Sequence, residues 1–146
     1  PAADMKWSAE AMSESFYMSN MSPQKAAFNR GIWKKLETKV RGWATREGAV
    51  LIVTAGVLKP GLKTIGVNKV SVPKLFYKVI LDNTEPELKG IGFILQNKGS
   101  KRALSNYAFT IDKVESVTGI DFFHSLEDEI EEAVESTLDL SKWDFD

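Results

Sequence analysis

Cysteine is absent from this sequence of 146 residues, and histidine occurs once. Without thiolates no sulfur-ligated metal site is available, and cysteine usage gives no indication of the redox compartment. No apolar run reaches the roughly 20 residues that a membrane-spanning helix needs. Histidine is the side chain whose unperturbed pKa lies nearest neutrality, so general acid–base chemistry by this chain alone has one obvious candidate, His124.

Familiar hydrolase and nucleotide-binding motifs are missing as well. The glycines form no phosphate-binding loop of the Walker or Rossmann type. The early serines have no histidine and acidic partners in a hydrolase pattern; they are Ser8, Ser13, Ser15 and Ser19. His124 lies near the far end of the chain, directly after two phenylalanines, where we expect a surface or packing histidine. The length fits one domain with a sizeable core.

Charge is divided unevenly along the chain although the net charge is only −1. Residues 1–120 hold 18 Lys and Arg against 10 Asp and Glu, whereas residues 121–146 hold 10 acidic residues against Lys142 alone. A basic body suits a polyanionic partner, because neutralised phosphates release counterions. The acidic end is expected to point away from nucleic acid. Solvated faces of both signs are the plainer interpretation, and charge alone favours it.

The segment from Phe28 to Arg46 has the periodicity of an amphipathic helix. A helix of 3.6 residues per turn places an apolar stripe on one side: Phe28, Ile32, Leu36, Val40 and Trp43. A neighbouring stripe carries Asn29, Glu37 and Arg41, with Trp33 in the turn between them. An amide, a carboxylate and a guanidinium therefore follow one another along the edge of a buried face. Gly48 is expected to end the helix.

The remaining elements predict an α+β fold with a largely antiparallel central sheet. Loops between consecutive strands are too short for helical crossovers. We expect a central strand over Ala49–Leu58, strands over Lys74–Leu81 and Ile91–Gln96, and a short strand or edge segment within Thr64–Val72. Helices are expected over Met5–Ser15, capped by Ser8; over Ile111–Val117, capped by Asp112; and over Glu127–Leu138. Phe16–Met18 is expected to be extended and buried, and Trp143 and Phe145 to pack the tail down.

Four short segments carry a resemblance to a known family. They are PAAD at Pro1–Asp4, SNMSPQ at Ser19–Gln24, FNRGIWKKLE at Phe28–Glu37 and TGIDFF at Thr118–Phe123. In order and spacing the chain resembles the DNA/RNA non-specific endonucleases of the ββα-metal class, most specifically in its first third. The resemblance implies a ββα-metal nuclease core and hydrolysis of phosphodiester bonds in DNA and RNA.

The resemblance also implies roles for four residues. Asn29 would be the direct ligand of Mg²⁺, for which Mn²⁺ can substitute, and Glu37 would hold a metal-bound water. Arg41 would steady Glu37 or contact phosphate, and Asn20 would orient the catalytic loop or the scissile phosphate. Taken singly, Asn20 also suits a turn, Asn29 a helix cap, and Glu37 with Arg41 an exposed ion pair one turn apart. The joint match of all four favours the catalytic roles.

In this family an Asp-Arg-Gly-His motif, whose histidine is the general base, directly precedes the PAAD segment. Residues 1–146 are therefore expected to form the C-terminal catalytic portion of a larger unit, with upstream strands and the base outside this chain. Alone, the chain is expected to be inactive without that segment or a companion chain. The resemblance further implies DNA and RNA as partners, no membrane, a homodimer as one assembly, and a secreted or periplasmic location. The alternative is a catalytically inactive nucleic-acid-binding or scaffolding module of the same fold.

Overall fold

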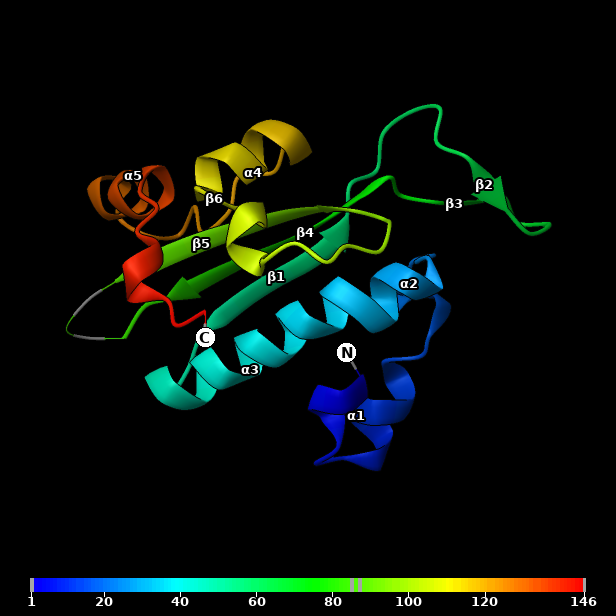
Figure 1. Ribbon diagram of the computed structural model, residues 1–146, viewed down its shortest axis with the longest axis horizontal. Helices are drawn as coiled ribbons and strands as arrows, with labels where there is room; N and C mark the ends of the chain where they lie inside the picture. The colour runs from blue at the N-terminus through cyan, green and yellow to red at the C-terminus, as the bar shows by residue number, and fades with distance from the viewer. Residues whose placement is uncertain (1, 85, 87, 146) are drawn as a thin grey trace.

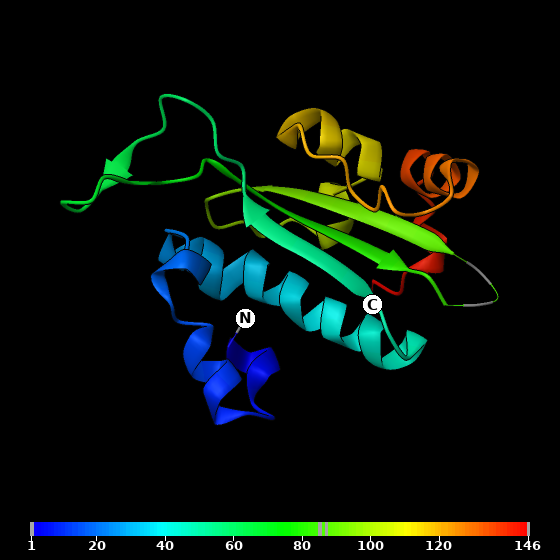
Figure 2. The same cartoon turned by 180° about the vertical axis from the view of Figure 1, so that it is seen from behind.

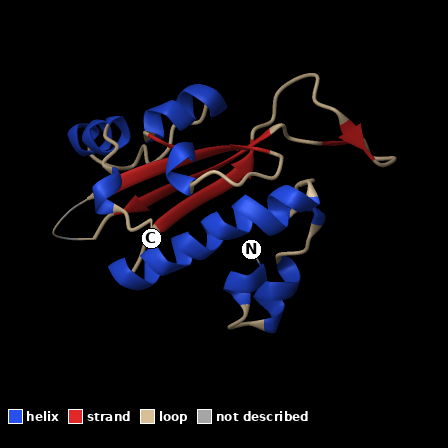
Figure 3. Cartoon of the chain, in the orientation of Figure 1, coloured by secondary structure: helices blue, strands red, loops and turns tan. Residues whose placement is uncertain are grey.

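A four-stranded antiparallel sheet forms the centre of the protein. The computed structural model describes residues 2–84, 86 and 88–145. Across the sheet the strands follow the order β1 (Leu51–Gly56), β4 (Leu75–Asp82), β5 (Lys89–Gln96) and β6 (Ala108–Phe109), and every neighbouring pair is antiparallel (Figures 1 and 3). The predicted α+β class with an antiparallel sheet is confirmed.

Helices cover both faces of this sheet. The long helix α3 (Lys34–Glu47) lies along one face, whereas α4 (Ile111–Thr118) and α5 (Asp128–Ser136) lie on the other (Figures 1 and 2). Successive side chains of a strand point to opposite faces, so β4 and β5 contribute to two separate cores. The molecule thus has three layers, with the sheet in the middle.

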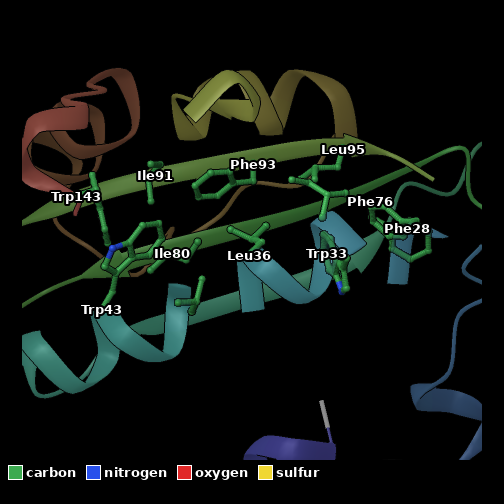
Figure 4. Close-up of a cluster of buried hydrophobic side chains, with 12 residues drawn as sticks. Phe28, Trp33, Leu36, Trp43, Phe76, Ile80, Ile91, Phe93, Leu95 and Trp143 are labelled. Atoms are coloured by element: carbon green, nitrogen blue, oxygen red, sulfur yellow. The ribbon is translucent and has the colours of Figure 1, made fainter. Parts of the chain in front are cut away.

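The core under the long helix is rich in aromatic side chains (Figure 4). Trp43 packs on Trp143 with ring centroids 4.9 Å apart, and its indole Nε1 donates to the carbonyl of Asp144 at 2.8 Å. Phe145 also packs on Trp43, so the predicted packing of the tail is confirmed. The buried residues of this core are Phe28, Ile32, Trp33, Leu36, Val40, Trp43, Phe76, Ile80, Ile91, Phe93, Leu95 and Trp143.

The opposite core joins β4 to α4 and α5. Its buried members are Val57, Tyr77, Val79, Leu81, Ile111, Val114, Phe122 and Val134. Gly92 on β5 permits the close approach of α4, because a Cβ at this position would lie 2.4 Å from Cγ2 of Val114. The N-cap of α4 is Thr110, whose hydroxyl accepts from the amide of Lys113, and not Asp112 as the sequence suggested.

The predicted helix contains a kink at Gly31, where two helical segments meet. It runs through α2 (Ala26–Phe28), the π-helical turn η3 (Asn29–Trp33) and α3. Gly31 has φ −104° and ψ −113°, which is not helical, and a residue without Cβ tolerates this geometry. The predicted helix is confirmed, as is its end at Gly48, where φ is +86°. The π-turn lies at Asn29, the residue expected to bind metal.

The N-terminal segment lies on the side of the long helix away from the sheet (Figures 1 and 2). It consists of η1 (Ala2–Met5), α1 (Ala9–Glu14) and η2 (Met18–Asn20). The hydroxyl of Ser8 accepts from the amide of Ala11, which confirms the predicted cap. The expectation of a buried, extended Phe16–Met18 is wrong. Phe16, Tyr17 and Met18 are exposed because no described element covers this part of the chain.

Strand β1 lies at the edge of the sheet and not in its centre, contrary to the sequence prediction. Among the described strands it pairs with β4 alone, and Leu51 and Ile52 are 50% and 45% exposed. An apolar run predicts that a strand is buried, but it does not predict which neighbouring element covers the strand. The segment Thr64–Val72 forms a separate ribbon of β2 (Thr64–Ile65) and β3 (Val70–Ser71) that projects from the body (Figure 1).

The rest of the described chain consists of two short 3-10 helices and connecting loops. They are η4 (Leu104–Tyr107) and η5 (Leu140–Lys142). Within the described residues, every helix is too short or too polar to cross a lipid bilayer.

Candidate active site on the long helix

Charged side chains gather on the flank of the long helix that faces the N-terminal segment. Arg41 of α3 pairs with Asp4 of η1 through its Nε. Glu37 is half-buried one turn earlier. Within the described part of the chain no ion pair joins Glu37 to Arg41, so the simple pair one turn apart is not formed. Asp4 was part of the PAAD motif, but the sequence suggested no role for it.

A buried lysine from the sheet completes this charged group. Lys78 of β4 is 3% exposed, and its Nζ donates to Oγ1 of Thr54 at 2.6 Å. The ammonium also lies 5.0 Å from the centroid of the Trp33 ring, a favourable cation–π geometry. Burial lowers the pKa of Lys78 to about 8, although the charges of Glu37 and Asp4 act in the opposite direction. The site therefore combines two carboxylates and two cations beside a buried helix face.

Asn29 lies at the π-turn with its amide held on one side. Its Nδ2 donates to Oε1 of Gln24, which leaves Oδ1 as the oxygen directed elsewhere. A neutral amide oxygen with a carboxylate further along the same helix suits a hard ion such as Mg²⁺. This ion retains most of its water and needs few protein ligands. The donor set therefore fits the metal that the resemblance implies. Asn29 does not cap the helix, whose N-cap is Lys25.

The loop before Asn29 is anchored to the sheet by a buried amide. Asn97 is 6% exposed, and its Nδ2 donates to the carbonyls of Pro23 and Pro73 at 3.1 and 3.0 Å. Its Oδ1 accepts from the amide of Lys25 at 2.8 Å. These bonds hold the chain on both sides of Gln24, the residue that orients Asn29. Asn97 thus holds this loop in place, a role that the sequence did not indicate.

Asn20 and His124 lie outside this charged group. The Nδ2 of Asn20 donates to the carbonyl of Glu14 at 2.9 Å, as expected for a residue that stabilises a turn. His124 is exposed after Phe123, on the same side of the sheet as α4 and α5. The structure thus brings Glu37 and Arg41 together with Asp4 and Lys78. Among the described residues, no hydrogen bond or ion pair joins these four to Asn20 or Asn29.

A basic groove runs along the other flank of the long helix. Its volume is about 1010 Å³. The charged residues that line it are Arg30, Lys34, Lys35, Lys39, Arg46, Lys101, Arg102 and, as the single acid, Asp144. The groove lies between the long helix, the loop before η4 and the C-terminal tail. Such a concentration of cations suits a phosphate backbone.

Comparison with known proteins found relatives that are named nucleases. Nuclease EXOG, mitochondrial, of Mus musculus is 36% identical over 144 residues, a match that covers 87% of this chain and 39% of that protein. Nuclease 1, mitochondrial, of Schizosaccharomyces pombe is 33% identical and covers 86% and 45%. A solved structure of the EndoG/EndoGI complex matches with a TM-score of 0.78 and 28% identity, covering 86% of this chain and 57% of that one.

The fold is that of a ββα-metal nuclease core. The family model described as DNA/RNA non-specific endonuclease matches residues 1–129, and the chain belongs to this family. It spans less than half the length of the two curated relatives named above. Both names state a mitochondrial protein and so do not support the secreted or periplasmic location expected from the sequence.

Two members of the charged group could have been recognised only in part from the sequence. In the strand sequence KLFYKVIL, Lys78 has the same parity as Phe76 and Ile80, so alternation places an ammonium on a core-facing side. The alternation thus indicates from the sequence that Lys78 is buried. It does not indicate the acidic neighbours of Lys78, because Asp4 and Glu37 are far from it in the chain. Contacts over such separations depend on the tertiary fold.

The lowered pKa of Lys78 predicts a specific dependence of stability on pH. Below pH 8 this lysine is protonated in both states, whereas between pH 8 and 10.5 the unfolded chain binds a proton that the folded chain does not. The free energy of unfolding should therefore rise with pH through this window. Between about pH 7.5 and about pH 9.5 the wild type should gain about 1–2 kcal/mol relative to Lys78→Met. Urea unfolding at the two pH values measures this difference, and equal pH responses would contradict the assignment.

Proposed function

We propose that this chain forms the metal-binding and phosphate-binding part of a Mg²⁺-dependent endonuclease that hydrolyses phosphodiester bonds of DNA and RNA. The order of Asn29, Glu37 and Arg41 along one helix carries this proposal. Family membership and the nuclease names of the relatives support it. Specificity for base sequence is not expected, because the contacts would be made to backbone phosphates.

Each side chain of the site has a distinct task in this proposal. Asn29 offers Oδ1 to the metal, and Glu37 holds a water in the metal's shell. Arg41, steadied by Asp4, directs guanidinium donors toward a phosphate oxygen. Asn20 keeps the preceding loop in place. When bound, Mg²⁺ offsets the charge of the phosphate and of the leaving oxygen and acidifies a bound water; Mn²⁺ can take its place.

The proposal requires a general base from outside the described residues. The single histidine is on the far side of the sheet, and Glu37 would be occupied in holding a water of the metal ion. We propose that an upstream segment of the same protein, or a companion chain, supplies this base and pairs with the free edge of β1. The exposed Leu51 and Ile52 on β1 support the proposed pairing of that segment with this strand. A homodimer is compatible with the exposed apolar side chains of the N-terminal segment.

An inactive nucleic-acid-binding module is the alternative function. The basic groove favours it, because phosphate binding by Lys and Arg needs neither metal nor base. The two functions differ in one respect: only the nuclease requires Asn29.

Asn29→Ala is expected to abolish Mg²⁺-dependent nicking of plasmid DNA by the longer protein that includes the upstream segment. The loss should be at least about 100-fold, because removal of even a supporting group at a metal site costs about 10–100-fold. Asn106→Ala is the matched control, since Asn106 is an exposed amide that bonds only its local backbone. Thermal unfolding checks that both variants fold. Nicking by Asn29→Ala at the wild-type rate would remove Asn29 from the site.

Lys35→Glu is expected to weaken DNA binding and to lower its salt dependence, because Lys35 lines the basic groove. Loss of one phosphate contact reduces the slope of log affinity against log salt by roughly 0.9. Lys113→Glu is the matched control: it makes the same charge reversal on an exposed position of α4, across the sheet. Fluorescence anisotropy over a salt series measures both. A larger loss of DNA affinity in Lys113→Glu than in Lys35→Glu would indicate that DNA binds on the α4 side of the sheet, and it would contradict this prediction.

The 146-residue chain alone is expected to be nearly silent in a nicking assay with Mg²⁺ and to gain activity when the upstream segment is supplied. General-base catalysis is typically worth about 10²–10⁴ in rate. Two variants identify the base if the short chain does cleave. Activity lost in Lys78→Met would assign proton abstraction to the neutral form of Lys78, and activity lost in His124→Ala would assign it to histidine. Strong, EDTA-sensitive cleavage that survives both changes would contradict the requirement for an upstream base.

A further inference from the structure

Five acidic side chains converge between α4 and α5, on the face of the sheet opposite the long helix. Asp112 and Glu115 come from α4, Asp121 from the following loop, and Glu131 and Glu135 from α5. Carboxylate oxygens of Asp112, Glu115 and Glu135 lie within 4.8 Å of one another. The same holds for Asp121, Glu131 and Glu135, so Glu135 belongs to both groups.

Glu135 is buried at the centre of this cluster without a hydrogen-bond partner for one of its oxygens. The residue is 5% exposed, and no group in the described structure donates to its Oε1. Oε1 of Glu131 is likewise buried and without a donor. Buried polar atoms in native proteins nearly always have a partner. Two carboxylate oxygens without a donor in one small region are suitable ligand atoms for a cation.

The backbone holds part of the cluster in place. Oε1 of Glu115 accepts from the amide of Phe122 at 2.6 Å, which ties the loop after α4 to the helix. This bond turns one oxygen of Glu115 toward the backbone and leaves Oε2 for the cluster. Val114 and Val134, which neighbour Glu115 and Glu135 in sequence, are buried in the adjoining core. The acidic groups are thus carried on packed elements and not on a loose surface.

The electrostatic surroundings of Glu135 are entirely acidic. Burial, together with the charges of Glu115, Glu131, Asp112 and Asp121, raises the pKa of its carboxyl to about 8. No ion pair among the described residues involves any member of the cluster; Lys89, the cation on β5, pairs with Glu47 and Asp82 instead. A cluster of this kind gains most from a cation, because acids this close repel one another.

We propose that Glu135 and the acidic side chains around it form a Ca²⁺ site that joins α4 to α5. Ca²⁺ takes six to eight oxygen ligands at about 2.3–2.6 Å in flexible geometry. Two oxygens on opposite sides of such an ion are about 4.8 Å apart, and the grouped oxygens here lie within that separation of one another. Mg²⁺ demands a tighter octahedron and keeps its waters, so it suits this crowded all-carboxylate site less well. The ion would neutralise the cluster and fasten the two helices.

This site is separate from the proposed nuclease centre. The sheet lies between α3 on one side and α4 with α5 on the other (Figure 1). Binding of Ca²⁺ therefore tests the proposal without any reference to cleavage.

Isothermal titration calorimetry and thermal unfolding of the 146-residue chain with CaCl₂ test the site directly. We expect one saturable Ca²⁺ site per chain. At about 100 times the dissociation constant, the melting temperature should rise by roughly 5–10 °C over the value in EDTA. Glu135→Gln should bind at least tenfold more weakly and lose the shift. Glu131→Gln should weaken binding as well and serves as the second variant, with circular dichroism to verify that both fold.

Two controls make the result specific to the cluster. Glu132→Gln removes the same charge from the neighbouring exposed position of α5 and should keep the full response to Ca²⁺. Asn29→Ala removes the proposed Mg²⁺ ligand on the other face and should keep it too. Absence of saturable binding up to about 10 mM, above the weakest typical protein Ca²⁺ sites, would overturn the proposal. So would an unchanged Ca²⁺ response in Glu135→Gln, or a Mg²⁺ response of equal size that Glu135→Gln abolishes.

Discussion

Packing of the long helix across β4 and β5 is the constraint on which the rest of this structure depends. Trp33 contacts Phe28 and Phe76, and at the other end of the helix Trp43 contacts Phe93 and the C-terminal Trp143. Large aromatic side chains bury more surface than any others and allow few alternative arrangements. The two aromatic contacts therefore set both the position and the rotation of the helix. That rotation places Glu37 and Arg41 on one flank and the basic groove on the other.

The sheet separates two buried ionisable side chains, a lysine and a glutamate, whose surroundings differ. Lys78 lies under the long helix, with Glu37 and Asp4 as its attracting neighbours. Glu135 lies on the far side among other acids. A buried charge is costly unless it is compensated. The acidic neighbours of the lysine favour its charged form and are the residues that the nuclease proposal uses, whereas the acidic neighbours of the glutamate disfavour its charged form. This difference is why the acidic cluster points to a bound cation and the lysine does not.

Local pattern predicted much of the fold and part of the candidate site. The long helix follows from apolar residues three and four apart and from Gly48 at its end, and the strands around Val79 and Phe93 follow from short apolar runs. The site residues Asn29, Glu37 and Arg41 were suggested by their spacing on that helix and by resemblance to a family that the comparisons confirm. The prediction that β1 lies in the centre of the sheet was wrong. Its apolar composition is typical of a buried strand, but the strands that pair with it are determined by the tertiary fold.

The sequence alone determined most helices and strands and the family. Periodicity, helix caps and short motifs depend on neighbours a few positions apart, so they can be recognised without the tertiary structure. Tertiary structure alone decided which distant side chains meet. Asp4 reaches Arg41, Asn97 holds the loop that orients Asn29, and Glu135 joins acids from another helix. Each of these contacts spans many residues of chain and forms only when the layers pack. A local pattern carries no information on such contacts, because it contains neither partner's position in space.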